Sequence, residues 1–402
     1  MIGQAGAFDK CIAKSIRKSE MKILLVGGTG VLSTDIAKLA IKRGYEVTML
    51  NRGTRPGRMA EGVRHMQADI RNADHTKRAL GNKIFDVTLD FLSYNPDQLS
   101  QTFSCLDGRC GQYIFISSAT VYKGTARGEV KTEESPIFND RFAYALDKSR
   151  CERLLEETCA KGSTGFTIVR PSITYGETRI PFGLIARPRQ WTLIHRILSR
   201  KPVVLWDNGE AICTLTHTTD FAKAMVGLCG NSRALDQVFH ITSDETFTWR
   251  EVLELIAETV GEAPVIASIP STSIAAVFPE EKGRLLGDRA KDNIFDNTKI
   301  REAVPEFDCT TDLRTGLKTT LDYYRSHEKM MRVDYRWDGL MDRLVLRYRS
   351  VLASSDSPSH KLGYIPAPGS NFRDRANYIS SRHPVAGTAI RLLGSVKRAL
   401  LR

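Results

Sequence analysis

The chain has 402 residues, of which 42% are hydrophobic and 26% charged, a composition typical of a globular protein with room for two domains. A disordered or fibrous protein is excluded, and no uncharged apolar stretch approaches the roughly 20 residues that cross a bilayer. The net charge is +12, and +8 of this lies in residues 326–402, so the excess of basic residues belongs to the C-terminal tail.

Residues 1–20, an N-terminal extension, do not have the pattern of a secretory signal, because they contain no continuous apolar core. Met21 directly precedes the first predicted strand and is an alternative native start. The eight cysteines are scattered, without C-x-x-C and without histidines at metal-ligand spacing. This pattern predicts reduced thiols in a cytoplasmic protein, and no metal site.

From Lys22 onward, short β-branched runs alternate with amphipathic runs of helix length, as in a parallel sheet covered by helices on both faces. A helix is predicted at 34–43 from its apolar spacing, and a longer one near 141–160. The predicted strands are 22–26, 46–50, 63–67, 86–92, 112–117 and 165–170. The pattern predicts an α/β fold with a Rossmann-type, doubly wound parallel sheet, whose cofactor-binding core spans residues 21–170.

After Pro171 the pattern becomes irregular, with loops containing glycine and proline. One more strand is predicted at 237–242 and a helix at 248–260, with Thr248 as its N-cap. Residues 171–325 are therefore expected to hold the remaining Rossmann elements and a smaller substrate lobe. Residues 326–402 are expected to form a basic helical tail, with helices at 330–352 and 385–402 joined by a linker at 353–370.

A glycine-rich turn follows the first strand directly and opens a helix, the context in which a dinucleotide fingerprint is meaningful. In the sequence Gly27-Gly28-Thr29-Gly30-Val31-Leu32-Ser33, serine replaces the third glycine of the pattern. Such a loop lets backbone N–H groups approach a pyrophosphate at the helix N-terminus. Cofactor contacts are therefore expected at Gly27, Thr29, Gly30, Val31 and Leu32, the alternative being a plain glycine-rich turn.

The end of the second strand carries Asn51 and Arg52, where NAD-selective folds place an acidic residue against the ribose hydroxyl. An arginine at this place, with Arg55 and Arg58 behind it, fits a 2′-phosphate and favours NADP(H) over NAD(H). A solvated basic loop is the alternative.

After the third strand, the Asp69 carboxylate is expected to accept a hydrogen bond from the adenine amino group, with Ile70 packed on the ring. The alternative for Asp69 is an ordinary surface turn.

A tyrosine and a lysine, Tyr144 and Lys148, are four residues apart on a predicted helix and therefore lie on one face. A lysine ammonium beside a phenol favours the phenolate and lowers its pKa, which makes the tyrosine a usable acid or base. Taken alone, this spacing also fits a tyrosine and a lysine that are both exposed on the surface of a helix.

A run of Ser117-Ser118-Ala119-Thr120-Val121-Tyr122 ends the fifth predicted strand, and Arg170-Pro171-Ser172-Ile173-Thr174-Tyr175-Gly176 follows the sixth. With these motifs the chain resembles an extended short-chain dehydrogenase/reductase of the NAD-dependent epimerase/dehydratase family over roughly residues 21–325. The segments starting at Thr216 and Thr248 are similar to later motifs of that family.

This resemblance implies that Ser118 hydrogen-bonds the reacting hydroxyl or ketone, Tyr144 exchanges its proton, and Lys148 holds the nicotinamide ribose and polarises Tyr144. Hydride passes between the substrate carbon and the nicotinamide. Contacts are also expected from Phe91, Leu92 and Pro171 to the cofactor and from Thr120 to the substrate.

Two departures from the family pattern narrow the substrate chemistry. Ala119 and Thr120 stand where water-eliminating members have an Asp-Glu pair, which disfavours a 4,6-dehydratase. Ile173 and Glu177 replace residues common in sugar-nucleotide epimerases. Arg187 and Arg189 are expected to supply the diphosphate contact instead, with Arg196 and Arg200, or plain surface charge, as alternatives.

The sequence thus predicts an NAD(P)-dependent epimerase or ketoreductase that acts on a nucleotide-sugar or related polyol, as in polysaccharide biosynthesis. The alternative is a non-catalytic Rossmann module that binds nucleic acid or a protein, although no nucleic-acid face is evident. The amphipathic pattern of residues 389–402 fits packing on the body or on a second subunit of a homodimer. It also fits an interfacial helix on the inner, anionic surface of a membrane.

Overall fold

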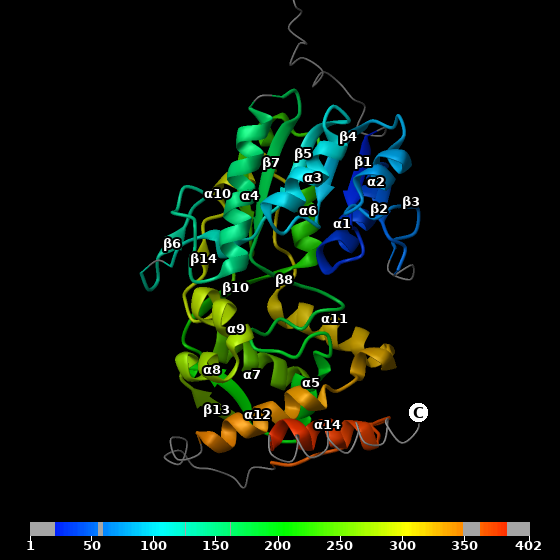
Figure 1. Cartoon of the computed structure of the whole chain (residues 1–402). Coiled ribbons are helices and arrows are strands. Elements are labelled where there is room, and N and C mark those ends of the chain that lie inside the picture. Colours follow the sequence, from blue (N-terminus) through cyan, green and yellow to red (C-terminus); the bar gives the residue numbers. More distant parts are fainter. Residues whose placement is uncertain (1–20, 55–58, 125, 161, 349–361, 384–402) are drawn as a thin grey trace, which may run out of the picture.

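A computed structural model describes residues 21–54, 59–124, 126–160, 162–348 and 362–383. Its centre is a seven-stranded, entirely parallel sheet in the order β11-β7-β5-β4-β1-β2-β3 (Figure 1). The strands are β1 (Lys22–Val26), β2 (Glu46–Asn51), β3 (Arg64–Gln67), β4 (Phe85–Asp90), β5 (Cys110–Ile116), β7 (Gly165–Pro171) and β11 (Gln237–Ile241). The predicted Rossmann-type α/β fold is confirmed.

Helices cover both faces of this sheet and bury two separate apolar cores. The α1/α6 core lies under α1 (Val31–Lys42), α6 (Thr218–Leu228) and α10 (Thr298–Ala303). The α3/α4 core lies under α2 (Ala73–Leu80), α3 (Pro96–Leu106) and α4 (Ala143–Cys159). Burying both faces explains why the strands read as continuous β-branched runs rather than as alternating ones.

One predicted strand was two residues too long, and the reason bears on the site. Instead of running to residue 92, β4 ends at Asp90, a fully buried residue. Its carboxylate accepts the backbone N–H groups of Leu92 at 2.8 Å and Ser93 at 3.1 Å, which turns the chain out of the sheet. Phe91 and Leu92 are thereby placed at the carboxyl edge of the sheet.

A second lobe lies beyond this edge (Figure 1) and has its own apolar core, the lobe core. Its helices are α5 (Trp191–Leu198), α7 (Trp249–Thr259), α8 (Ser271–Val277), α9 (Pro279–Arg284), α11 (Leu313–Ser326), α12 (Tyr335–Arg347) and α14 (Phe372–Arg382). This lobe contains one three-stranded sheet, of β8 (Ile173–Tyr175), β10 (Ile212–His217) and β12 (Thr246–Thr248), and one pair of strands, β9 (Val203–Trp206) and β13 (Ile266–Ile269). A further pair is formed by β6 (Val130–Lys131) and β14 (Ile294–Phe295).

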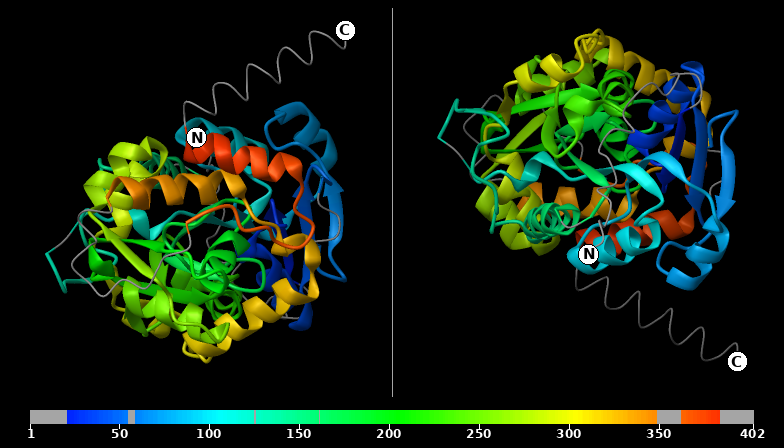
Figure 2. Two further views of the ribbon diagram at one scale, coloured as in Figure 1. Left: turned by 90° about the horizontal axis from the view of Figure 1, so that it is seen from below. Right: turned by 90° about the horizontal axis from the view of Figure 1, so that it is seen from above.

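The last two helices of the described chain pack into the lobe core rather than standing apart from it. Figure 2 shows α12 and α14 side by side, and Tyr335, Met341 and Tyr378 are buried in the same cluster as residues of β8 and α5. The predicted final helix at 385–402 and the first half of the predicted linker, residues 353–361, lie outside the described residues. Among the described helices, none is both long and apolar enough to cross a membrane.

The cysteines of the described chain are free thiols, and all except the half-buried Cys309 are buried. Four of them, Cys105, Cys110, Cys151 and Cys159, belong to the α3/α4 core. Cys229 belongs to the α1/α6 core and Cys213 to the lobe core.

Candidate active site

The loop after β1 adopts a conformation that requires glycine at two successive positions. Gly27 and Gly28 have φ of +109° and +91°. A Cβ on Gly28 would lie 2.6 Å from the Cγ of the buried Met49. Helix α1 begins at Val31, and the Ser33 hydroxyl accepts the Gly30 N–H at 3.0 Å. Serine in the third fingerprint position therefore closes the first turn of the helix without blocking the loop.

The space around this loop fits a dinucleotide. A cavity of about 170 Å³ is lined by Thr29, Gly30 and Val31, beside the N-terminal end of α1. A larger cavity of about 550 Å³ is lined by Leu32 and Phe91 and extends toward the second lobe. Since any side chain on Gly27 or Gly28 would fill the loop, the residues present suit a pyrophosphate bound at the helix N-terminus.

The two residues expected near the cofactor ribose, Asn51 and Arg52, have different surroundings. The Asn51 amide donates to the Gly27 carbonyl at 3.1 Å, and its oxygen accepts the Gly53 N–H at 2.7 Å, so Asn51 supports the loop. Arg52 is exposed next to it, with its side chain accessible to a ligand. Arg55 and Arg58 lie outside the described residues.

At the end of β3, the Asp69 carboxylate accepts the Arg71 N–H at 3.0 Å and so forms the turn that leads into α2. Ile70 is buried. Both predicted adenine contacts therefore lie at the carboxyl edge of the sheet.

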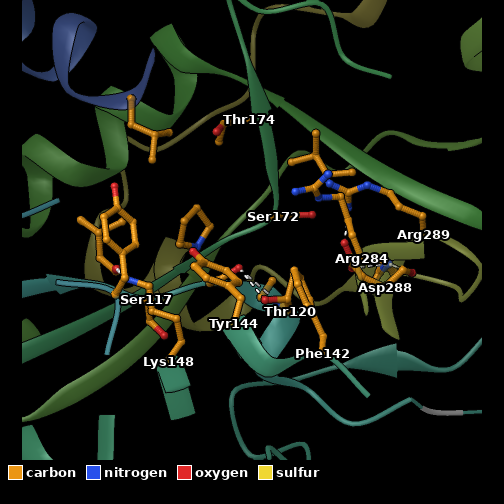
Figure 3. Close-up of a pocket in the computed structure, with 18 of the residues that line it drawn as sticks. Ser117, Thr120, Phe142, Tyr144, Lys148, Ser172, Thr174, Arg284, Asp288 and Arg289 are labelled. Atoms are coloured by element: carbon orange, nitrogen blue, oxygen red, sulfur yellow. Dashed lines mark hydrogen bonds and ion pairs between the residues drawn. The ribbon is translucent and has the colours of Figure 1, made fainter. Parts of the chain in front are cut away.

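The predicted catalytic residues meet in the larger cavity. Ser118, Tyr144 and Lys148 all line it, together with Pro171 and Thr120. They come from the end of β5, the first and second turns of α4, and the end of β7. Figure 3 shows Tyr144 and Lys148 on one side of this cavity, with Arg284 and Arg289 on the other.

The ammonium group of Lys148 is held by the backbone of the loop after β4 and of the last residue of β5. Its Nζ donates to the carbonyl oxygens of Ser93 and Ile116, both at 2.7 Å. Burial lowers the pKa of Lys148 to about 8. The ammonium also lies 5.9 Å from the centroid of the Tyr144 ring.

Burial and polar neighbours shift the pKa of Tyr144 in opposite directions. Burial raises the pKa of Tyr144 to about 12, and the effects that lower this pKa come from a hydrogen bond to Ser118 and from the charge of Arg179. The acid–base group is thus tuned by Ser118 and Arg179.

Ser118 is oriented by its neighbour Thr120. The Ser118 oxygen accepts the Thr120 hydroxyl at 2.9 Å and the Thr120 N–H at 3.3 Å. Because Ser118 accepts from both groups, its own proton is available to donate toward Tyr144 or a substrate oxygen. Thr120 therefore orients Ser118, in addition to lining the cavity.

Two other motif residues are structural. Ser117 donates to Glu152, and Glu152 forms a buried ion pair with Arg170 at 2.7 Å. Arg170 also donates to the Glu133 carbonyl at 2.9 Å. This network ties α4 to β5 and β7, and it holds the backbone next to Ser118 in place.

The far end of the cavity is strongly basic, which sequence reasoning largely missed. Of the arginines there, Arg187 was expected; Arg179, Arg284 and Arg289 were not. Burial and the neighbouring arginines lower the pKa of Arg179 to about 9 and of Arg187 to about 10. Arg284 pairs with Glu281 at 2.6 Å, and Arg289 with Asp288, but the buried Nε of Arg289 has no hydrogen-bond partner.

The remaining arginine predictions are corrected. Arg189 lines a separate cavity of about 210 Å³ and donates to the Val333 carbonyl at 3.0 Å, because the chain turns between Arg187 and Arg189. Arg196 is buried in ion pairs with Asp338 and Asp342. The exposed Arg200 lies 3.7 Å from Glu262. None of these three arginines lines the cavity of Tyr144.

Known proteins resemble both this sequence and this fold. The profile of the NAD dependent epimerase/dehydratase family matches residues 102–241. A chloroplast stem-loop binding protein of 41 kDa from Arabidopsis thaliana is 27% identical over 259 residues, 60% of this chain and 64% of that protein. The 2'-dehydrokanamycin reductase of Streptomyces kanamyceticus is 24% identical over 290 residues, 71% of this chain and 80% of the reductase.

Among solved structures, the Thermus thermophilus UDP-glucose 4-epimerase in complex with NAD matches with a TM-score of 0.61 and 19% identity. That match covers 76% of this chain and 100% of the epimerase. The resemblance predicted from the sequence motifs is confirmed.

Proposed function

Because the profile of the NAD dependent epimerase/dehydratase family matches residues 102–241, we propose that the chain is an NAD(P)-dependent epimerase or ketoreductase of a nucleotide-sugar or related polyol. The observation that carries this proposal is the placement of Ser118, Tyr144 and Lys148 in one cavity at the carboxyl edge of the sheet. In parallel α/β folds, ligands bind at this edge.

In the proposed reaction, Tyr144 moves the proton of the reacting oxygen. Ser118 donates a hydrogen bond to that oxygen while Thr120 keeps the Ser118 hydroxyl in place. Lys148, fixed by two carbonyl groups, holds its ammonium 5.9 Å from the centroid of the Tyr144 ring and would bind the ribose of the cofactor. A nicotinamide, when bound, supplies the hydride acceptor or donor for the substrate carbon.

The phenolate of Tyr144 is the base that the oxidative direction needs. Its pKa of about 12 in the protein without cofactor makes the phenolate scarce at neutral pH. Arg179 and the Ser118 hydroxyl both favour the charged form, and a positively charged nicotinamide adds to their effect. Proton abstraction is therefore expected to become more favourable when a positively charged nicotinamide is bound.

The basic end of the cavity supports an anionic substrate. Arg179 and Arg187 have no ion pair among the described residues, and the buried Arg289 Nε lacks an acceptor. A diphosphate supplies several oxygen acceptors and two negative charges, which suits guanidinium groups that converge from separate elements. We propose a nucleotide-sugar as the substrate because of this positive charge and because the similar Thermus structure is that of a UDP-glucose 4-epimerase.

For the cofactor, exposed Arg52 and the absence of an acidic side chain at the end of β2 favour NADP(H). The solved epimerase was captured with NAD. An epimerase must retain its cofactor through oxidation and re-reduction, whereas a reductase must release it, so cofactor retention separates the two activities.

A nucleic-acid-binding function is the second candidate, because one relative is named a stem-loop binding protein. The two functions make different demands on Tyr144. Hydride chemistry requires its phenol, whereas stem-loop binding requires neither the phenol nor the buried ammonium of Lys148.

The experiment is to measure bound nicotinamide in the purified protein, then turnover of UDP-glucose and NADPH oxidation with keto-sugars, beside RNA gel shifts. Turnover that is lost in Tyr144→Phe, with tightly bound NAD(H), supports the epimerase. Turnover with exchangeable NADPH supports the reductase. Stem-loop binding unchanged by Tyr144→Phe, without bound cofactor or turnover, overturns the enzymatic proposal.

A further inference from the structure

Two unpaired arginines of the active-site wall lie on one stretch of chain. Residues 176–201, which we name the arginine segment, carry Arg179 and Arg187 and end beyond α5. Neither guanidinium forms a hydrogen bond or ion pair within the described part of the chain. Their positions are therefore set by the backbone that carries them.

That backbone is held from outside by α11. The Thr320 hydroxyl donates to the Gly176 carbonyl at 3.0 Å, and the Tyr324 hydroxyl donates to the Thr178 carbonyl at 3.1 Å. These two contacts bracket the turn that leads into Arg179, whose N–H donates to the Gly176 carbonyl at 3.0 Å.

The rest of the arginine segment is held by residues 328–348 and 362–383, which we name the C-terminal clamp. Arg189 donates to the Val333 carbonyl at 3.0 Å, and the Asp334 N–H donates to the Thr192 hydroxyl at 2.8 Å. His195 Nε2 lies 3.1 Å from the Ile365 carbonyl oxygen. These contacts begin two residues after Arg187.

A buried cluster of four charges makes this attachment firm. Arg196 lies 2.5 Å from Asp338 and 2.9 Å from Asp342. Lys201 lies 2.6 Å from Asp338 and 2.9 Å from Asp342. All four side chains are almost fully buried, and the Tyr378 hydroxyl of α14 donates to Asp342 at 2.5 Å. Two cations of the arginine segment thus match two anions of the clamp.

We propose that the C-terminal clamp is a positioning unit of the active site: it fixes residues 189–201 and, with α11 holding residues 176–178, sets Arg187 and Arg179 to meet an anionic substrate. The proposal rests on the proposed function for the nature of that substrate. It assigns a role to residues that lie outside the family match at 102–241. A buried, charge-matched joint suits this task, because it specifies one register between two elements where apolar packing tolerates several.

The test removes charge from the joint without changing its volume. Asp338→Asn leaves two buried cations facing one anion, and loss of a paired charge in such a cluster is strongly destabilising. The double variant Lys201→Met/Asp338→Asn restores the balance and keeps the pair of Arg196 with Asp342. Glu258→Gln, which breaks the exposed pair of Glu258 with Arg314, is the matched control.

Two readouts separate positioning from packing. Hydrogen–deuterium exchange follows the amides of residues 176–190, and calorimetry measures the affinity for UDP-glucose and for NADPH. In Asp338→Asn we expect faster exchange in 176–190 and about tenfold weaker UDP-glucose binding, with NADPH affinity unchanged; the double variant should recover both. Where Asp338→Asn does not fold, Tyr378→Phe removes one hydrogen bond to Asp342 and should show a smaller effect of the same kind.

Faster exchange confined to α12 and α14, with exchange in 176–190 and ligand affinity unchanged, would overturn the proposal. Equal losses of UDP-glucose and NADPH affinity would also overturn the proposal. A unit that positions only the substrate end of the cavity should leave the loop after β1, and therefore NADPH binding, unchanged. If the wild-type protein binds no UDP-glucose, the proposed substrate class fails, while the exchange measurement still decides the role of the clamp.

Discussion

Replacing Gly28 with alanine should damage both folding and cofactor binding. At φ of +91° a Cβ brings backbone strain of about 1–2 kcal/mol. The new Cβ would also lie 2.6–2.8 Å from three atoms of Met49, whose side chain is fully buried. Such overpacking costs about 1–3 kcal/mol, so the free energy of unfolding should fall by roughly 2–5 kcal/mol.

Gly128→Ala is the matched control, because Gly128 has φ of +76° and its Cβ would meet nothing within 4 Å. The free energy of unfolding of Gly128→Ala should therefore fall only by the cost of the backbone strain, about 1–2 kcal/mol. Urea unfolding of both variants isolates the steric contribution, and calorimetry with NADPH should show weakened binding for Gly28→Ala alone. Equal stability losses in the two variants, or normal NADPH affinity in Gly28→Ala, would refute this account of the loop.

Three further outcomes are expected. Tyr144→Phe should lower kcat by about 10²–10⁴ with little change in NADPH affinity, and kcat within threefold of wild type would contradict the acid–base role. Arg52→Ala should weaken NADPH binding by about 1.5–3 kcal/mol and leave NADH binding nearly unchanged in calorimetry, with Arg64→Ala as control; equal losses for both cofactors would show no selectivity. Burial lowers the pKa of Lys148 from 10.5 to about 8. Between pH 8 and pH 10.5, Lys148 therefore binds a proton more readily in the unfolded chain than in the folded one. The free energy of unfolding should then rise over this pH range by on the order of 3 kcal/mol. Urea unfolding of Lys148→Met should lack this rise, and an identical pH dependence in both proteins would count against it.

Local patterns predicted the sheet well, and the candidate catalytic residues that they indicated line one cavity. Each motif is short: the residues of the glycine turn, of the Tyr144 and Lys148 pair and of the serine run after β5 are close together in the sequence. Periodicity and the order of the motifs were therefore enough to place them. The overlong strand at 86–92 shows the limit, because the turn at Asp90 depends on one carboxylate capturing two N–H groups. Nothing in hydrophobicity distinguishes that arrangement from two more strand residues.

The basic end of the cavity could not be predicted in the same way. Arg284 and Arg289 are about 140 residues from Tyr144 in the chain and reach its cavity only through the packing of the second lobe. Within one short loop, Arg187 faces the cavity and Arg189 faces α12, a difference set by the path of the backbone. The only signal was the local density of arginine, which equally describes a solvated surface.

The buried thiols provide built-in reporters of unfolding. Burial raises the pKa of Cys110 to about 11 and those of Cys151, Cys159 and Cys229 to about 12, so in the folded state these four thiols offer a thiol reagent almost no reactive thiolate. The α3/α4 core, the α1/α6 core and the lobe core each contain their own cysteines. Pulse alkylation followed by peptide mass spectrometry would therefore reveal the sequence in which the three cores open, without introducing a single label by mutation.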